Sequence, residues 1–200
     1  MMVAGEGGSS YAYVLSGGSV QRIDEADGGA VTIDGTKVAY TKIVDGFDNL
    51  YVWDRGTNTS RLVVSGGDSL FPSFSKDGAW ILFSSNRDGT TDTPWDLYQV
   101  PTAGGTIERI TNTPTINEFG ACYNEARTMV SYVGQAATGD LTGVWVLSNT
   151  SVTQIATDWD ANLGTYWTTS AGRSGRPRGA RFQRLTLPKN LKKSLKTRHK

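Results

Sequence analysis

Short apolar runs separated by glycine-containing turns give the middle of the chain a strand-turn-strand pattern. Between residues 71 and 89 the sequence FPSFSKDGAWILFSSNRDG predicts a first strand over 71–75, a tight turn on Asp77 and Gly78, and a second strand over 80–85. Asp favours such a turn because its side chain hydrogen-bonds the backbone, and Gly because it accepts a positive φ. A third strand over 97–100, a turn on Gly104 and Gly105, and a fourth strand over 106–111 complete the predicted unit.

The same order of parts recurs on both sides of this unit. The preceding copy covers 33–40, 49–54 and 60–63, and the following copy covers 119–123, 128–132, 143–147 and 152–155, with Asn-Glu-Ala-Arg at 124–127 in place of the Asp-Gly turn. Tyr51, Tyr98 and Trp145 are spaced 47 residues apart, so the third strands keep one register and insertions fall in loops. A period in the forties with four short strands per unit predicts an all-β fold, a β-propeller of four-stranded antiparallel blades.

The stretches 71–78, 81–89 and 97–98 resemble the repeat of TolB-like (WD-like) β-propellers. Lys76 stands where that family usually has Pro, and Phe74 where Trp is common. The three copies together cover about 31–160. Propellers of this family occur in periplasmic translocation proteins, in non-catalytic domains of prolyl-oligopeptidase-like enzymes and in some polysaccharide lyases. The resemblance therefore implies the fold rather than one function.

The two ends of the repeat region predict partial blades. Residues 11–23 have the pattern of a third strand, a Gly-Gly turn and a fourth strand, and 165–172 that of an opening strand. We therefore expect a propeller segment over 9–172, an incomplete arc of about three full blades plus partial blades, with a closed four-bladed ring as the alternative. An open arc leaves blade faces uncovered, which favours self-association, a protein partner or a longer parent chain.

Charge divides the chain into two parts. Residues 1–172 hold all 19 acids and 9 bases, whereas 173–200 hold 11 bases and no acid. The second part lacks apolar alternation and is predicted to be a basic, mostly disordered tail. It could bind nucleic acid or an anionic membrane, lie across the acidic body, or be a sequence end without a role; nucleic acid is expected to bind through this tail or not at all.

The residues that most enzymes need are scarce. His199 is the single histidine and lies in the tail, so no Ser-His-Asp or Cys-His arrangement is expected on the body. A Gly-x-Ser-x-Gly elbow, a phosphate-binding glycine loop and a Cys/His cluster are all missing from the sequence. The chain is therefore predicted to be non-enzymatic, without cofactor or metal.

Compartment and redox state are only partly indicated. The lone Cys122 excludes an intramolecular disulfide and is expected to be a small buried residue, at the position that Phe74 has in the best blade. No apolar run is long enough to span a membrane. Residues 1–10 lack a secretory signal, so the protein is either cytoplasmic or has lost a leader, whereas the family resemblance implies a periplasmic or extracellular place.

The candidate binding residues lie in predicted loops. Asp88, Asp92 and Asp96 could ligate calcium if their loop folded back, although turn, solvated and strand-capping roles explain them as well. Trp53, Tyr98 and Trp145 recur with the third strand and are expected to pack between blades. Trp95 and Trp159 are candidates for an exposed contact, so Asp88, Asp92, Trp95 and Trp159 form the predicted set.

The predicted function is a scaffold for protein–protein interaction. Its surface would be formed by loops between second and third strands (41–49, 86–96, 134–143) and between blades (65–70, 112–118, 157–164). The alternative is the propeller portion of a larger enzyme, a prolyl-oligopeptidase-like hydrolase or a polysaccharide lyase, that lacks its catalytic part.

Overall fold

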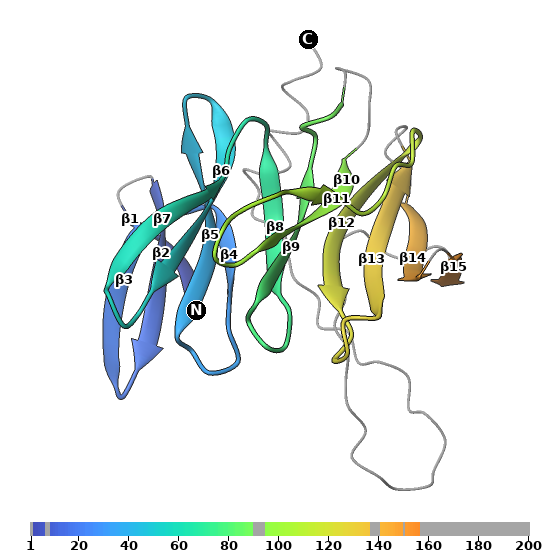
Figure 1. Ribbon diagram of the computed structural model, residues 1–200. Helices are drawn as coiled ribbons and strands as arrows, with labels where there is room; N and C mark the ends of the chain where they lie inside the picture. Colours follow the sequence, from blue (N-terminus) through green and yellow to red (C-terminus); the bar gives the residue numbers. More distant parts are fainter. Residues whose placement is uncertain (1, 7–8, 90–94, 137–140, 150, 157–200) are drawn as a thin grey trace, which may run out of the picture.

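A computed structural model of the protein describes residues 2–6, 9–89, 95–136, 141–149 and 151–156. This part of the chain consists of strands, turns and loops, and contains no helix. The strands form four antiparallel sheets that lie side by side in chain order, from β1 to β15 (Figure 1). Within this part the structure confirms the predicted all-β class, and it contains no helix that could span a membrane.

Three of the sheets have four strands in sequential order, as a propeller blade requires. The second sheet consists of β4 (Gly28–Val31), β5 (Lys37–Val44), β6 (Phe47–Asp54) and β7 (Thr59–Val64). The third consists of β8 (Ser69–Phe74), β9 (Trp80–Ser85), β10 (Asp96–Pro101) and β11 (Glu108–Arg109). The fourth consists of β12 (Ile116–Tyr123), β13 (Met129–Ala136), β14 (Leu141–Ser148) and β15 (Ser151–Ala156).

The first sheet has three strands, β1 (Met2–Glu6), β2 (Ser9–Ser16) and β3 (Ser19–Glu25). The sequence pattern indicated β2 and β3 but not β1, whose Met-Val-Ala-Gly-Glu lacks the alternation of a half-buried strand. Since β1 pairs with β2, it takes the place of a second strand, and the first-strand position is not filled by a described residue. Over the described residues the four sheets form an open arc (Figure 1), in agreement with the predicted incomplete propeller.

Equivalent turns join the first and second strands of the three complete sheets. Asp77 Oδ1 accepts hydrogen bonds from the Ser75 hydroxyl (2.5 Å) and the Ala79 N–H (3.0 Å), and Gly78 has a φ of 68°. In the fourth sheet Asn124 Oδ1 accepts from the Thr128 N–H (2.8 Å), and Arg127 takes the left-handed conformation with a φ of 56°. The replacement of Asp-Gly at 124–127 therefore changes the residues but keeps the turn.

Apolar residues fill three seams between adjacent sheets. The first seam, between the first and second sheets, contains Ala12, Val14, Ala26, Val38, Tyr40 and Trp53. The second seam contains Ala39, Leu50, Val52, Val64, Ile81, Phe83, Tyr98 and Val100. The third seam contains Leu82, Leu97, Ala121, Tyr123, Val130 and Tyr132, with Trp145 packed against it. Each sheet thus buries an apolar face on its neighbour, which is the main stabilising contact in a repeat array.

The predicted packing role of the third-strand aromatic residues is confirmed, with one correction of register. Tyr51 pairs with Tyr40, Tyr98 with Phe83 and Trp145 with Tyr132, so Tyr51 rather than Trp53 is the equivalent of Tyr98. Trp53 lies two residues further along β6, which places it on the same side of the strand and in the first seam.

Other sequence predictions are corrected by the pairing. The fourth strand of the third sheet was predicted over 106–111 but is limited to Glu108–Arg109, because the Thr111 hydroxyl accepts the Leu97 N–H (2.8 Å) in place of a ladder carbonyl. Residues 41–49 were predicted as a loop, yet β5 and β6 extend to a two-residue turn on Asp45 and Gly46 with φ of 54° and 85°. This is the geometry that suits the twist of a hairpin.

Cys122 was also misplaced by the sequence pattern. It pairs with Ser131, whereas Ser73 pairs with Leu82 and Phe74 with Ile81, so Cys122 is the equivalent of Ser73. Its side chain is half-buried rather than buried, with Sγ 3.2 Å from Ser131 Oγ. The shift of one residue exchanges the two faces of a strand.

Candidate recognition surface

Three aromatic side chains gather where the third and fourth sheets meet. Phe71 packs edge-on against Phe119, with ring centroids 5.7 Å apart, and Trp95 packs against Phe119 at a tilt, with ring centroids 5.9 Å apart. Phe71 belongs to β8, Phe119 to β12, and Trp95 directly precedes β10. In an antiparallel sheet the first and third strands begin at the same end, so this aromatic cluster (Phe71, Trp95 and Phe119) lies at the end predicted as the recognition surface.

The backbone of Phe71 is in a conformation that suits glycine. Its φ is 54°, and the equivalent residue in the next sheet is Gly120, with a φ of 59°. Both residues lie in a bulge of the first strand, between Leu70 and Ser73 in β8 and between Phe119 and Cys122 in β12. For a bulky residue this conformation costs on the order of 1–3 kcal/mol. Phe71 is nevertheless 36% exposed, so the strained residue presents a ring to solvent.

Hydrogen bonds across the sheets fix the position of Trp95. The backbone N–H of Trp95 donates to Asn117 Oδ1 (2.9 Å), and its backbone carbonyl accepts the Glu118 N–H (2.8 Å). The preceding pair of sheets has the equivalent bond, from the Asp48 N–H to Asp68 Oδ1 (3.0 Å). A side chain at the start of a first strand therefore holds the start of the third strand of the sheet before it, and we call this contact the latch.

A fully buried carboxyl lies beside the latch. Glu118 has no exposed surface, and its oxygens accept hydrogen bonds from the hydroxyls of Thr111 and Thr113 (2.9 Å for Thr113). The Tyr132 hydroxyl also bonds to it. Burial raises the pKa of Glu118 to about 7, although the two threonine hydroxyls act in the opposite direction. Glu118 can therefore change its charge near neutral pH.

Arg87 occupies the corresponding end of the second seam. Its guanidinium carbon lies 5.5 Å from the ring centroids of both Phe83 and Tyr98. Its Nε donates to Ser85 Oγ (3.2 Å) and its Nη2 to Ser69 Oγ (3.1 Å). Burial lowers the pKa of Arg87, yet an arginine stays charged at any physiological pH.

The predicted site residues have different positions in the structure. Asp88 is exposed, and its Oδ2 accepts a hydrogen bond from the Tyr98 hydroxyl (2.9 Å). Trp95 is half-buried in the aromatic cluster. Asp92 and Trp159 lie outside the described residues, as do 90–94 and everything after 156. The structure thus places Asp88 at the second seam and Trp95 at the third, and the two side chains do not contact each other.

Two of the three carboxylates considered for calcium, Asp88 and Asp96, already have protein partners. Asp96 is buried, and it accepts the Arg109 guanidinium (2.6 Å) on one oxygen and the Thr113 N–H (3.0 Å) on the other. Within the described ranges no group of three acidic, histidine or cysteine side chains is arranged to hold a metal ion. Sequence reasoning missed Phe71, Phe119 and Arg87. Phe71 could have been found from the sequence, because an alignment of the repeats places it at the position where the next repeat has Gly120.

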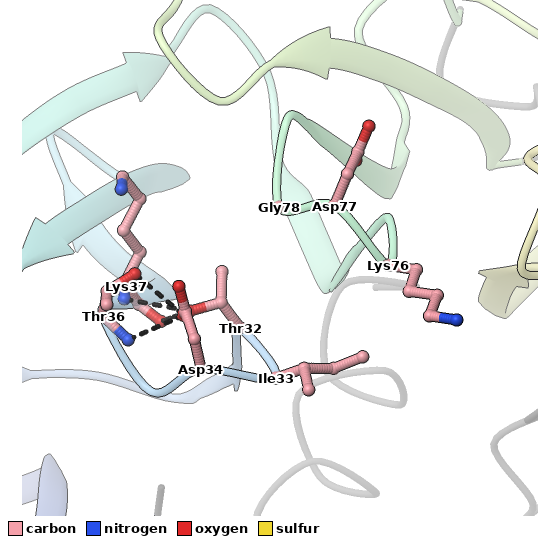
Figure 2. A pocket seen from close by; sticks show the side chains of 8 residues that line it. All are labelled: Thr32, Ile33, Asp34, Thr36, Lys37, Lys76, Asp77 and Gly78. Carbon is pink, nitrogen blue, oxygen red and sulfur yellow. Dashed lines mark hydrogen bonds between the residues drawn. The ribbon is translucent and has the colours of Figure 1, made fainter.

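A small hollow lies at the opposite end of the sheets. It has a volume of about 190 Å³ and is lined by the strand-joining turns of the second and third sheets, Thr32, Ile33, Asp34, Thr36, Lys37, Lys76, Asp77 and Gly78. Figure 2 shows Asp77 and Lys76 directed away from Asp34, which bonds within its own turn. Hydrogen bonds from Thr32 and then Thr36 lower the pKa of Asp34 to about 2. Lys37 pairs with Asp54 and Lys76 with Glu125, so the charges serve the fold.

Comparison with solved structures identifies the fold. The chain is similar to a TolB protein from Agrobacterium tumefaciens, with 22% identity and a TM-score of 0.64 over 74% of this chain and 57% of that one. It is similar to TolB from Acinetobacter baumannii at 19% identity and a TM-score of 0.63, over 78% of this chain and 40% of that one. The β-propeller domain of the trilobed protease from Pyrococcus furiosus, which has an open velcro topology, matches at 10% identity and a TM-score of 0.56, over 78% and 52%.

These similarities establish an incomplete TolB-like β-propeller, as the sequence repeat predicted. The chain spans less than two thirds of the length of either TolB structure. Parts of a puromycin hydrolase and an oligogalacturonate lyase have a similar fold, at 14% and 15% identity. No family model and no curated protein matches the sequence.

Proposed function

We propose that this chain is a non-enzymatic β-propeller scaffold that binds a protein partner through the aromatic cluster of Phe71, Trp95 and Phe119. The observation that carries the proposal is Phe71, a bulky exposed residue held at a positive φ where the next sheet has glycine. Such a conformation has a free-energy cost, and residues of this kind concentrate at functional sites. The fold alone does not require an aromatic side chain at this position, because Gly120 forms the same bulge.

The rest of the cluster supports a binding role. Aromatic rings are frequent anchors of protein interfaces because they bury a large area with few rotatable bonds. Trp95 is held by its backbone bonds to Asn117 and Glu118, so the cluster is ordered before a partner arrives. A preorganised surface loses less conformational entropy on binding.

The experiment is selection of binding peptides from a random library against the full chain, followed by affinity measurements with variants. Phe71→Gly suits the backbone at residue 71 and should leave the thermal transition unchanged or raised, yet weaken binding at least tenfold. Ile33→Ser is the matched control, because Ile33 is 81% exposed at the opposite end of the sheets. Equal affinities for the Phe71→Gly and Ile33→Ser variants would reject the aromatic cluster as the binding surface.

The alternative is the propeller portion of a larger enzyme, a hydrolase or a lyase. It is supported by the similarity to the propeller of the trilobed protease and to parts of a hydrolase and a lyase. Sequencing of the transcript distinguishes the two functions. A catalytic domain in the same reading frame would favour the enzyme over the scaffold.

A further inference from the structure

The guanidinium of Arg87 is built into the second seam but has no carboxylate partner among the described residues. Lys37, Lys42, Lys76 and Arg109 each form an ion pair with a carboxylate, and Arg87 forms none with a described residue. Asp88, next to Arg87 in sequence, accepts the Tyr98 hydroxyl instead. Asp68 accepts the Asp48 N–H and the Asn86 amide (3.1 Å). A partly desolvated charge without a counter-ion costs free energy, which a ligand of opposite charge can recover.

The contacts of Arg87 fix its orientation. The Ser85 hydroxyl donates to the Asp68 carbonyl (2.6 Å), so Ser85 Oγ is left to accept the Arg87 Nε–H. Ser69 Oγ accepts one Nη2–H, and Phe83 and Tyr98 contact the guanidinium through their rings. Gly67 brings the loop before β8 directly against Arg87, because a Cβ there would lie 2.9 Å from the Arg87 Cα. Of the five N–H donors of the side chain, two serve these serines.

We propose that the N–H donors of Arg87 that no described residue accepts bind a carboxylate of the protein partner. A planar guanidinium binds a carboxylate through two parallel hydrogen bonds, which gives directional as well as electrostatic recognition. Phosphate has the same bidentate chemistry. A carboxylate is favoured because a single arginine supplies the positive charge and the next residue, Asp88, is acidic, so a doubly charged anion would be repelled more strongly.

This carboxylate site adjoins the aromatic cluster, and its extension to a peptide rests on the function proposed above. Ser69, which accepts from Arg87, lies two residues before Phe71 in β8. Two residues of a strand span about 7 Å. A partner segment with an acidic group beside an aromatic or aliphatic side chain therefore matches both features.

The test is nuclear magnetic resonance of the Arg87 Nε–Hε group in the full chain. Sodium phenylacetate, which carries a carboxylate and a ring, should shift this signal with a dissociation constant on the order of 10 mM. The neutral isostere phenylacetamide should not shift it, and inorganic phosphate should bind at least threefold more weakly than phenylacetate. No shift with phenylacetate, an equal shift with phenylacetamide, or tighter binding of phosphate would overturn the proposal. The same titration is repeated with the Asp92→Asn variant. If phenylacetate shifts the Arg87 signal in that variant but not in the parent chain, Asp92 is the partner of Arg87, and the proposal is overturned.

Two variants separate this site from the proposed function. Arg87→Lys has no Nε–Hε signal, so phenylacetate binding to it is followed through the backbone amide signals of Ser69 and Ser85, which contact Arg87 in the parent chain. Binding should weaken at least fivefold because an ammonium lacks the planar fork, and the thermal transition reports whether the variant is folded. Phe71→Gly should reduce phenylacetate affinity to that of acetate while the Arg87 signal still responds to both. If Phe71→Gly leaves phenylacetate binding unchanged, the carboxylate site stands and the aromatic binding surface fails.

Discussion

The backbone N–H of Trp95 donates to Asn117 Oδ1 over 2.9 Å. This bond joins the start of the third strand of the third sheet to the first strand of the fourth sheet. Asn117→Ala should leave this N–H without its partner and lower the free energy of unfolding by about 1 kcal/mol. Urea titration followed by tryptophan fluorescence measures the loss.

Asn117→Asp is the matched control for the latch. Asp68 accepts the Asp48 N–H in the equivalent position, so an aspartate oxygen is expected to replace the amide oxygen of Asn117 with little loss. If Asn117→Asp is destabilised as much as Asn117→Ala, the two latches are not equivalent.

Replacement of Gly78 by Val should destabilise the protein more than the same change at Gly104. Both residues have positive φ, 68° and 85°, so each substitution should cost on the order of 1–3 kcal/mol. A Cβ at Gly78 would also lie 3.1 Å from Thr32 Cγ2, a packed methyl group, whereas at Gly104 the nearest atom is the flexible Arg61 Nη1 at 3.4 Å. Urea titrations of the two variants should rank them in this order, and the opposite order would contradict the packing argument.

Stability should decrease as pH rises from about 4.5 to 7 because of Glu118. Burial raises its pKa from 4.5 to about 7, so the folded state binds a proton that the unfolded state releases in this range. The stabilisation is complete below the unfolded value and is lost as pH rises through about 7, with a size on the order of 1–3 kcal/mol. Urea titrations from pH 4 to 8 should show this slope, and Glu118→Gln should remove it. Parallel slopes for the two proteins would exclude Glu118 as the cause.

Calcium and chelator should leave the melting temperature unchanged. Asp88 and Asp96 already accept hydrogen bonds from Tyr98 and Arg109, and these contacts would have to break to make ligands. Calcium at a hundred times its dissociation constant would add about 2.7 kcal/mol, which calorimetry would detect easily. A calcium-dependent rise that Asp88→Asn abolishes would establish a metal site in the 86–96 loop.

Truncation after Gly172 should preserve the β-rich circular dichroism spectrum and the thermal transition, because the sequence predicts no blade strand beyond it. The remaining body has ten more acids than bases, so any affinity of the full chain for DNA or RNA should be lost and, in the full chain, should weaken steeply with salt. Unfolding of the truncated chain would favour a closed four-bladed ring instead of the open arc.

Local features of this protein were readable from the sequence alone. The strand spacing, the Asp77-Gly78 turn and the recurrence of Tyr51, Tyr98 and Trp145 each depend on residues close together in the chain, so pattern and turn chemistry predicted three blades. The sequence also predicted Trp95 as a candidate contact residue, and the structure packs it against Phe119. Where the pattern was weak it failed, as for β1 and the register of Cys122, because one inserted residue reverses the faces of a strand.

The tertiary structure decided what the candidate site consists of. The Phe71 bulge depends on the register with which β8 pairs with β9. The contact of Trp95 with Phe119 and the burial of Glu118 depend on how the third sheet packs on the fourth, between residues distant in sequence. The sequence does not distinguish Arg87 from other polar loop residues. The structure does, because two aromatic rings and two serines surround its guanidinium at the second seam. Packing between sheets determines which of the described side chains are exposed, strained or without an ion pair to another described residue, and these properties carry the proposed recognition of an acidic partner segment.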